Sequence, residues 1–431
     1  MFRVSIFLIS VFILSGCVSQ IPVEPEQKSD ANQKSFEQED TMILFALRAE
    51  QLKDYESASE LFYNLYEKSD KKEYLYRSLQ SDLVLSNNER VIKRVDDVLK
   101  GSQDDYILVR MKAVALIQMQ KYEETKNILS KLVEKSNLVD DYIMLSDVYV
   151  KLDKFDMAIK YLESAYAQDY SEKVLDKMSI VLYVNLQRKK DAIAYLETHA
   201  RVHGCSELIC TRLLAFYSND NNIDGILSAY LRLYKINSSE DVAKKIVQIY
   251  SYKREYLQMM NFLEESGSDD ATLLQLYSNT KNYKKAFSLS DKLYATTGET
   301  EYLGQSAIFE YESAKNKSDK ELLKRVTKKF ENVVKDAKNP LYLNYFGFIL
   351  IDHDIDVNKG VIYVQEALKI EPDSIYYQDS LAWGYYKLGR CEEASSIMSK
   401  VIKKDGENDP EVLLHGQEIE KCLNINTEAK K

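Results

Sequence analysis

The amino-acid sequence predicts an all-α protein, and three observations support this prediction. Of its 431 residues, 13 are Gly and 5 are Pro, which together is about 4% against roughly 12% in an ordinary globular chain. No proline occurs between Pro25 and Pro340, whereas sheet-rich folds need a turn residue every ~8–12 positions. Hydrophobic residues (45%) and charged residues (29%) are both abundant, and similar apolar positions return at a regular interval along the chain. The chain can therefore bury a large core between helices.

The first twenty residues have the pattern of an export signal. Arg3 precedes an apolar run from Val4 to Leu14, which is too short to cross a bilayer and matches the apolar core of a secretory signal peptide. The run ends in the letters LSGC, the last of which is Cys17. This ending resembles the lipobox of bacterial lipoproteins, in which the Cys becomes the lipidated first residue after cleavage. An ordinary signal peptide with an incidental Cys is the alternative.

The resemblance to lipoproteins implies an anchor and a location. Residues 1–16 form the signal peptide, and acyl chains on Cys17, palmitate among them, hold the mature chain on a membrane, since stable anchoring needs more than one chain. Val18 stands where Asp is the usual inner-membrane retention signal, so the expected location is the outer membrane, on its periplasmic face. Residues 17–39 are polar, contain two prolines and show no helical period. We expect them to form a disordered tether.

The charge of the chain argues against nucleic-acid binding. With 58 Lys and Arg against 68 Asp and Glu the formal charge is −10, and loss of Arg3 with the signal peptide makes it 57 − 68 = −11. A net acidic chain lacks the electrostatic footprint of a nucleic-acid-binding protein. Charge alone would also not hold the chain on anionic lipid.

The clearest repeating unit lies near the C-terminus. The stretch from Leu381 to Ala394 resembles the tetratricopeptide repeat (TPR), a helix–turn–helix unit, with its small residue at Ala382 and its aromatic residue at Tyr385. Two antiparallel helices approach closely only where a side chain is small or missing, and one such unit cannot bury its own apolar face. Further units must therefore stack on it. The preceding unit has the matching residues Gly347, Gly360, Ala367 and Pro372.

Counting from Ala394 towards the N-terminus gives a ladder of equivalent positions, most of them one TPR length apart, which is about 34 residues. The step from Met259 to Ala286 is shorter and the step from Ala286 to Val326 is longer, which predicts a short unit followed by one with an insertion near residues 315–321. The ladder positions are Ala58, Val91, Thr125, Ala158, Ala192, Gly225, Met259, Ala286, Val326, Gly360 and Ala394. The resemblance implies a right-handed superhelix of about eleven repeats over residues 40–409, namely 40–71, 72–105, 106–138, 139–172, 173–205, 206–239, 240–266, 267–299, 300–339, 340–374 and 375–409. An amphipathic segment at 410–424 is expected to cap this solenoid, and 425–431 to form a disordered tail.

Four cysteines follow the lipidation site, and an even number in an exported chain favours disulfides. Four cysteines allow three connectivities. We expect the local one, with Cys205 bonded to Cys210 and Cys391 bonded to Cys422, because Cys391 opens the last second helix and Cys422 lies in the capping segment. Four buried free thiols are the alternative.

Other possible sites of chemistry are weak. His199 and His203 are four residues apart on a predicted helix, but the intervening residues do not complete the HExxH metal motif, and His353 and Asp356 fall in a predicted turn. The nucleophile-elbow, P-loop and dinucleotide-binding motifs are absent from the sequence. We therefore expect no metal, no cofactor and no enzymatic activity.

In TPR proteins the first helix of each unit lines a concave surface, on which extended peptides or helices of protein partners bind. Transferred to this sequence, the concave positions form one helical stripe, with Trp383 as its only tryptophan. The alternative is a stripe that packs in the core, and Trp383 favours a contact surface because Ala382 and Tyr385 already take the packing positions. The stripe consists of Tyr376, Asp379, Trp383, Tyr386 and Lys387, and of Asn344, Tyr345, Phe348 and Asp352 in the preceding unit.

The segment from Leu343 to Val401 also resembles the ends of repeat lipoproteins of Gram-negative envelopes. Some of these are adaptors that recruit a periplasmic carboxyl-terminal processing protease or its substrates. The expected function is thus an outer-membrane-anchored periplasmic scaffold or adaptor, which binds protein partners by tethering and has no small-molecule substrate. Two alternatives stay open. One is a pilotin or assembly factor for a secretin or other outer-membrane machine, and the other is a peptidoglycan-handling enzyme, for which the repeats leave no separate catalytic domain.

Overall fold

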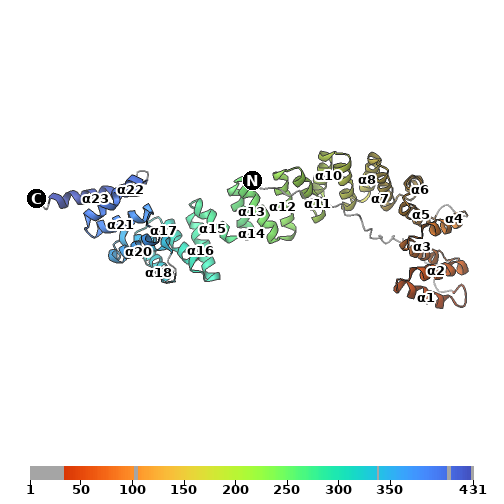
Figure 1. Ribbon diagram of the computed structural model, residues 1–431, viewed down its shortest axis with the longest axis horizontal. Helices are drawn as coiled ribbons and strands as arrows, with labels where there is room; N and C mark the ends of the chain where they lie inside the picture. Colours follow the sequence, from red (N-terminus) through yellow and green to blue (C-terminus); the bar gives the residue numbers. More distant parts are fainter. Residues whose placement is uncertain (1–33, 101–104, 337–338, 405–408, 429–431) are drawn as a thin grey trace. The chain divides into compact units, whose positions relative to one another are not determined.

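The computed structural model describes residues 34–100, 105–336, 339–404 and 409–428. These residues form helices joined by turns and contain no strand, so the prediction of an all-α fold is confirmed (Figure 1). The chain divides into two compact units, residues 1–216 and 217–431. Within each unit, most helices pack against the next helix along the chain.

The first unit consists of helix–turn–helix pairs, and in one of them α9 continues into a π-helical turn, η1. The last helix of this series, α11 (Glu207–Asn219), extends into the second unit. The other helices are α1 (Glu39–Gln51), α2 (Tyr55–Ser69), α3 (Lys72–Val84), α4 (Asn88–Leu99), α5 (Tyr106–Gln118), α6 (Tyr122–Ser136), α7 (Val139–Lys151), α8 (Phe155–Asp169), α9 (Glu172–Ile180), η1 (Val181–Asn185) and α10 (Lys189–Val202).

The second unit continues with the same kind of pair and ends in one additional helix, α23 (Pro410–Glu428). Its two shortest helices are α14, at the end of the predicted short unit 240–266, and α15, at the start of the next predicted unit. The helices before α23 are α12 (Ile223–Asn237), α13 (Glu240–Lys253), α14 (Tyr256–Ser266), α15 (Asp270–Asn279), α16 (Tyr283–Thr297), α17 (Thr300–Ser313), α18 (Lys320–Asp336), α19 (Pro340–Asp352), α20 (Val357–Ile370), α21 (Ile375–Lys387) and α22 (Cys391–Lys404).

Both ends of the helical array differ from the sequence prediction. The predicted tether reaches residue 39, but residues 35–38 are bends and turns, and α1 begins at Glu39. Phe36 packs against the apolar core of the first helix pair, because burial stabilises an aromatic ring. At the other end, the predicted disordered tail is wrong for residues 425–428, which belong to α23, since neither Gly nor Pro stops the helix there. The predicted signal peptide and Cys17 lie outside the described residues.

The ladder positions mark where the helices of a pair approach most closely. At Gly360 on α20, an added Cβ would lie 2.6 Å from the side chain of Ile351 and 2.7 Å from the carbonyl oxygen of Gly347 on α19. The two glycines are therefore required by this close packing, since any side chain would separate α19 from α20. Eight ladder positions have no exposed area, namely Ala58, Val91, Thr125, Ala158, Ala192, Ala286, Val326 and Ala394.

The turns inside the pairs share a backbone feature. Four to six residues before each ladder position, one residue has a positive φ and so adopts the left-handed conformation. The exception is the pair α17–α18, whose longer connection at 314–319 lies at the predicted insertion. Only one of these residues is Gly, although the conformation costs other residues roughly 1–2 kcal/mol; packing of the pairs must hold the turns in place. The residues are Lys53, Ser86, Gln120, Asp153, Gln187, Asn221, Arg254, Lys281, Asp354 and Gly389.

Buried ion pairs connect neighbouring helices of the first unit. Arg110 of α5 donates to both carboxylate oxygens of Asp141 on α7, at 2.7 and 3.1 Å. Arg94 of α4 lies 2.8 Å from the carboxylate of Asp82 on α3. All four side chains are buried, and a buried charge without its partner is strongly destabilising. These pairs therefore specify which helices are neighbours.

Candidate partner-binding surface

Helices α19 and α21 carry the stripe that the sequence predicts as a contact surface. The side chain of Asn339 accepts a hydrogen bond from the Leu341 N–H, and Pro340 occupies the first turn, which is a favourable start for α19. A turn containing Pro372 precedes α21. The predicted contact residues are Tyr345 and Phe348 on α19, and Tyr376, Asp379, Trp383, Tyr386 and Lys387 on α21.

The last helix of the chain lies across the middle of this stripe. Helix α23 packs against both α21 and α22. The ring of His415 stacks on Trp383 with a centroid distance of 4.1 Å, and its Nδ1 lies 3.1 Å from both carboxylate oxygens of Asp379. Asp379 is 7% exposed and Trp383 is 9% exposed. The prediction that these two residues are open to a partner is therefore wrong in this structure.

The sequence indicated the capping helix but not the surface that it covers. Val412, His415 and Ile419 are buried on one side of α23, and their spacing is that of one helical face. Since His415 and Asp379 are 36 residues apart, no local pattern pairs them. The signal that could have pointed to the contact was a lone His on an otherwise apolar face.

Trp383 also contacts residues of α19 and of its own helix, α21. Its Nε1 donates a hydrogen bond to Asp352 Oδ1 at 3.0 Å, and its ring stacks on Tyr386 at 4.7 Å. The Lys387 Nζ lies 5.5 Å from the centre of the Trp383 ring and 2.8 Å from Asp354 Oδ2. Lys387 and Tyr386 are thus engaged with their own chain, although both remain partly exposed.

Three carboxylates, those of Glu411, Asp379 and Asp352, lie near one another where α23 packs on the stripe. Burial raises the pKa of Glu411, and the nearby charges of Asp379 and Asp352 raise it further, whereas His415 lowers it. On the adjoining turn, burial lowers the pKa of His353. The docked helix therefore brings one more acid, Glu411, and one base, His415, to an acidic surface.

The α19 part of the stripe is half-buried. Burial raises the pKa of the Tyr345 hydroxyl, with a further contribution from Glu312, and the Tyr345 ring stacks on Phe330 of α18. The ring of Phe348 lies 6.3 Å from that of His415. Asn344 is buried, and its side-chain oxygen has no hydrogen-bond partner among the described residues. This part of the stripe belongs mainly to the core.

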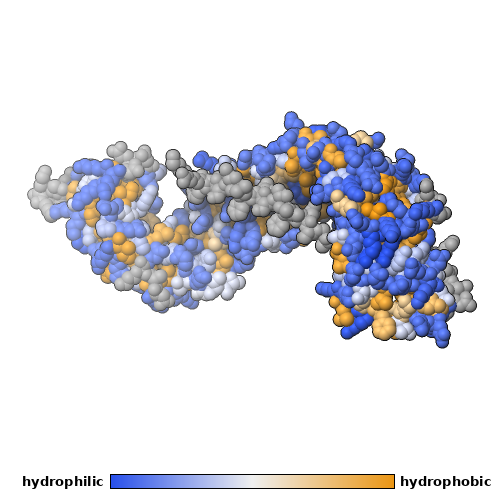
Figure 2. All heavy atoms as spheres, turned by 45° about the vertical axis from the view of Figure 1, so that its right-hand side comes forward, coloured by the Kyte–Doolittle hydropathy of each residue, from blue (hydrophilic) through white to orange (hydrophobic). Residues whose placement is uncertain are grey.

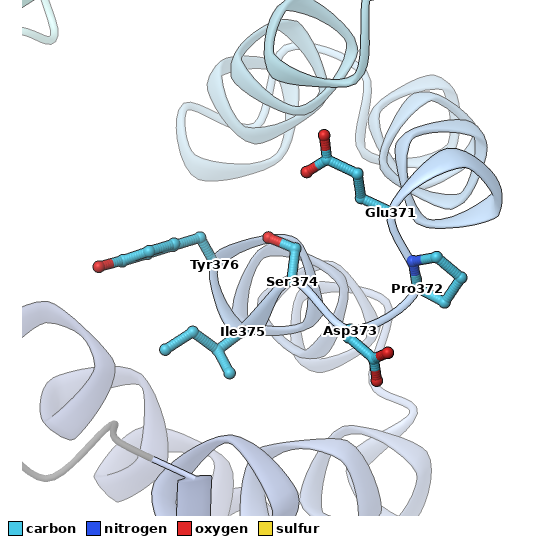
Figure 3. A pocket seen from close by; sticks show the side chains of 6 residues that line it. All are labelled: Glu371, Pro372, Asp373, Ser374, Ile375 and Tyr376. Atoms are coloured by element: carbon cyan, nitrogen blue, oxygen red, sulfur yellow. The ribbon is translucent and has the colours of Figure 1, made fainter. Parts of the chain in front are cut away.

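Tyr376 is the stripe residue that stays open, with 64% of its area exposed. It borders a shallow hollow of about 530 Å³ on the turn between α20 and α21, which the sequence analysis did not identify. In Figure 3, Tyr376 and Ile375 extend to one side of the turn, and Asp373 extends to the other. The hollow is lined by Glu371, Pro372, Asp373, Ser374, Ile375 and Tyr376.

The histidines considered as metal ligands have protein partners. His199 is buried, and its Nδ1 lies 2.8 Å from the Tyr166 hydroxyl and its Nε2 3.4 Å from a Glu172 oxygen. The ring of His203 lies 4.8 Å from that of His199. Within the described ranges, no three His, Cys, Asp or Glu side chains are grouped so that they could hold a metal ion. Asp356 accepts a hydrogen bond from the Lys359 N–H and so caps α20.

The four cysteines lie in two disulfides. Cys205 is bonded to Cys210, with their Cα atoms 5.6 Å apart. Cys391, the first residue of α22, is bonded to Cys422 of α23, with a Cα separation of 5.8 Å. The second disulfide crosslinks the covering helix to the pair that it covers. Both pairs are those that the sequence analysis favours.

Comparisons with known proteins extend this description. A family model described as the N-terminal TPR repeats region of Psidin matches residues 75–186, which run from α3 to η1. No curated protein matches the chain. None of the described helices combines the length and apolar composition needed to span a membrane.

Several solved structures are similar to part or most of the chain. The Cut9–Hcn1 hetero-tetramer of APC/C has a TM-score of 0.37 at 10% identity, covering 90% of this chain and 97% of that chain. MamA (41-end) from Desulfovibrio magneticus RS-1 has a TM-score of 0.35 at 15% identity, covering 40% and 99%. The P58(IPK) TPR domain has a TM-score of 0.29 at 12% identity, covering 90% and 99%.

The helix pairs and the family match together define an all-α solenoid of the TPR type. Solenoids of this kind present extended surfaces for other proteins. The fold therefore suggests a scaffold for protein–protein interaction.

Proposed function

We propose that the protein is a periplasmic scaffold, anchored in the outer membrane through Cys17, which binds protein partners and brings them together. The observation that carries the proposal is the run of helix pairs from α1 to α22, closed by α23. When such helix pairs stack, the chain forms an extended surface and not a catalytic cavity. The lipobox-like LSGC sequence supports the anchor, because it directly follows an apolar run of signal-peptide length.

We propose that partners bind at Tyr376, the residue of the stripe that stays exposed. Tyr376 and Ile375 offer an aromatic and an aliphatic side chain on one side of this turn, and the acidic residues Glu371 and Asp373 also line the hollow. Aromatic anchors with polar groups around them are typical of interface hot spots. We therefore expect a partner segment with an apolar residue next to a basic one.

Crosslinking and affinity purification from envelope extracts test the scaffold. We compare the wild type with a Tyr376→Ala variant and with a Tyr252→Ala variant, whose tyrosine is 77% exposed on α13. Recovery of a specific partner should fall at least tenfold for Tyr376→Ala, as is usual for a hot spot of about 1.4 kcal/mol or more, and stay unchanged for Tyr252→Ala. Equal recovery with both variants would refute this surface, and absence of any partner would refute the scaffold.

Fractionation tests the anchor separately. A Cys17→Ser variant should move from the outer-membrane fraction to the soluble periplasmic fraction, because its acyl chains are lost. Unchanged fractionation would show that Cys17 is not the anchor. The crosslinking experiment would still test whether Tyr376 contacts a partner.

A further inference from the structure

Helix α1 has large apolar residues on both of its sides: Met42 and Ile43 pack against the core of the first helix pair, and others face outward. Ala46 and Ala49 pack against α2, whereas Leu44 and Phe45 are 68% and 62% exposed, and Leu52 directly after the helix is 63% exposed. Among the described residues, seven large apolar side chains are more than 60% exposed, and three of them are these. A surface helix usually has charged and polar residues on its outer side. In Figure 2 apolar side chains gather at the lower end of the first unit, where Figure 1 places α1.

The position of α1 in the repeat explains this exposure. Phe45 stands 13 residues before Ala58, as Leu381 stands 13 residues before Ala394. Leu381 is buried against side chains of the preceding helix pair, such as Ile351. No described helix pair precedes α1. Its outer side is therefore a stacking surface that has no neighbour in the described part of the chain.

Charged residues of both signs border this surface. Arg48 and Lys53 are exposed beside the leucines, and Arg48 donates a hydrogen bond to Gln51 at 2.7 Å. Of the nearby carboxylates, Asp40 is paired with Lys34 and Glu50 with Arg77, and Asp54 accepts a hydrogen bond from the Ser57 N–H. Exposed leucine and phenylalanine side chains on one side of a helix are the part of this surface that the interface of a bilayer would bury.

We propose that the outer face of α1, formed by Leu44, Phe45, Leu47 and Leu52, rests on the surface of a lipid bilayer. This inference builds on the proposed anchor at Cys17. Lys34, the first described residue, follows Cys17 by 17 residues, a span of at most about 60 Å even when fully extended. The anchor thus holds α1, the first helix of the described residues, at a high local concentration of lipid.

A second copy of the chain is the less favoured occupant. Four side chains of this size bury on the order of 300–400 Å² in total, whereas a standard protein interface buries about 800 Å² per partner. A bilayer surface needs no matching shape, and the anchor already keeps it close. The small, flat and apolar face of α1 therefore fits lipid better than it fits a stable dimer.

Quenching by brominated lipid tests the proposal on the full lipidated chain. A tryptophan introduced by Phe45→Trp is compared with one introduced by Leu257→Trp, since Leu257 is 67% exposed on α14. Each variant is reconstituted in vesicles of phosphatidylethanolamine and phosphatidylglycerol with acyl-chain bromines, and the emission of the buried Trp383 is subtracted using the wild type. We expect at least twofold stronger quenching at position 45 than at position 257.

The controls separate the two proposals. If the wild type floats with the vesicles and the Cys17→Ser variant does not, Cys17 is the anchor. This result does not depend on the role of α1. Equal quenching at both positions in protein that floats overturns the role of α1 and leaves the anchor intact. A wild type that does not float overturns both. A different result would assign the face to a second copy. The wild type would sediment as a dimer, a Leu44→Gln, Phe45→Gln variant would sediment as a monomer, and quenching at position 45 would not exceed that at position 257.

Discussion

At the scale of single residues, the turns of this chain depart from the usual rule that glycine takes the left-handed conformation. Non-glycine residues such as Lys53, Gln120 and Asp153 have positive φ angles. The scarcity of glycine in the sequence is thus not a sign that the turns avoid this conformation. It shows that stacking of the helix pairs stabilises turns that are locally unfavourable.

A Gln120→Gly substitution should raise the free energy of unfolding by about 0.5–1 kcal/mol. Gln120 is exposed with a φ of 59°, and relief of that conformation outweighs the added backbone entropy of glycine. Urea denaturation followed by far-UV circular dichroism measures the change. A Lys131→Gly control, at an exposed position inside α6, should be destabilising by about 1 kcal/mol; a stabilised control would show that the turn conformation is not the cause.

Glu39 makes the start of α1 sensitive to acid. Burial raises the pKa of its carboxyl, but hydrogen bonds from Lys71, the Ser35 N–H and Tyr74 outweigh burial and lower the pKa to about 2, from an ordinary value of 4.5. Because the folded pKa is depressed, this carboxylate contributes stability above pH 4.5, and the contribution is lost as the pH falls towards 2.

A Glu39→Gln variant should therefore be less stable than the wild type at pH 7 and should converge with it towards pH 2. Thermal unfolding between pH 7 and pH 2 measures the difference in Tm. A Glu37→Gln variant provides the control, since Glu37 is exposed just before the same helix. A constant difference over the whole pH range would contradict the role of the Glu39 carboxylate.

At the scale of elements, α23 decides what the C-terminal end can bind. It stacks His415 on Trp383 and is crosslinked to α22 through Cys391 and Cys422. The stripe on α21 that the sequence predicts as a contact surface is therefore partly a docking site for the chain's own helix. Tyr376 lies outside this contact.

The crosslink should stabilise the docked state of α23. The two cysteines are 31 residues apart, and a loop of this length is worth about 3–4 kcal/mol in the chain-entropy description. A Cys391→Ser, Cys422→Ser variant should lower the urea concentration at which Trp383 emission shifts to the red. A Cys205→Ser, Cys210→Ser variant, which removes the other disulfide, should leave that transition unchanged; equal shifts would disprove a local effect.

At the scale of the whole molecule, stability should be distributed along the array. In a solenoid each repeat contacts only its neighbours, and here two compact units divide the chain near residue 216. The buried ion pairs lie between helices that are close in sequence, such as α5 and α7. The effect of damage at one helix pair should then weaken with distance along the chain.

An Asp141→Ala substitution tests this independence. It leaves Arg110 buried without its partner, which should destabilise the first unit by about 3–5 kcal/mol. We expect an earlier loss of far-UV circular dichroism in urea, while the Trp383 emission of the second unit keeps its midpoint. A joint shift of both signals would contradict the nearest-neighbour description. Replacing both residues together, Arg110→Met with Asp141→Leu, should recover most of the lost stability.

The sequence by itself determined the helical fold, because scarce glycine and proline and a regular repeat of apolar positions are local and repeating signals. It also indicated the cysteine pairs, because each pair joins segments that follow one another along the chain. Only the tertiary structure decided which apolar faces are covered. Trp383 and Phe45 both lie on amphipathic first helices, but α23 covers the one and no described helix covers the other. Burial depends on neighbours that are distant in sequence, such as His415 for Asp379, and no local pattern encodes them.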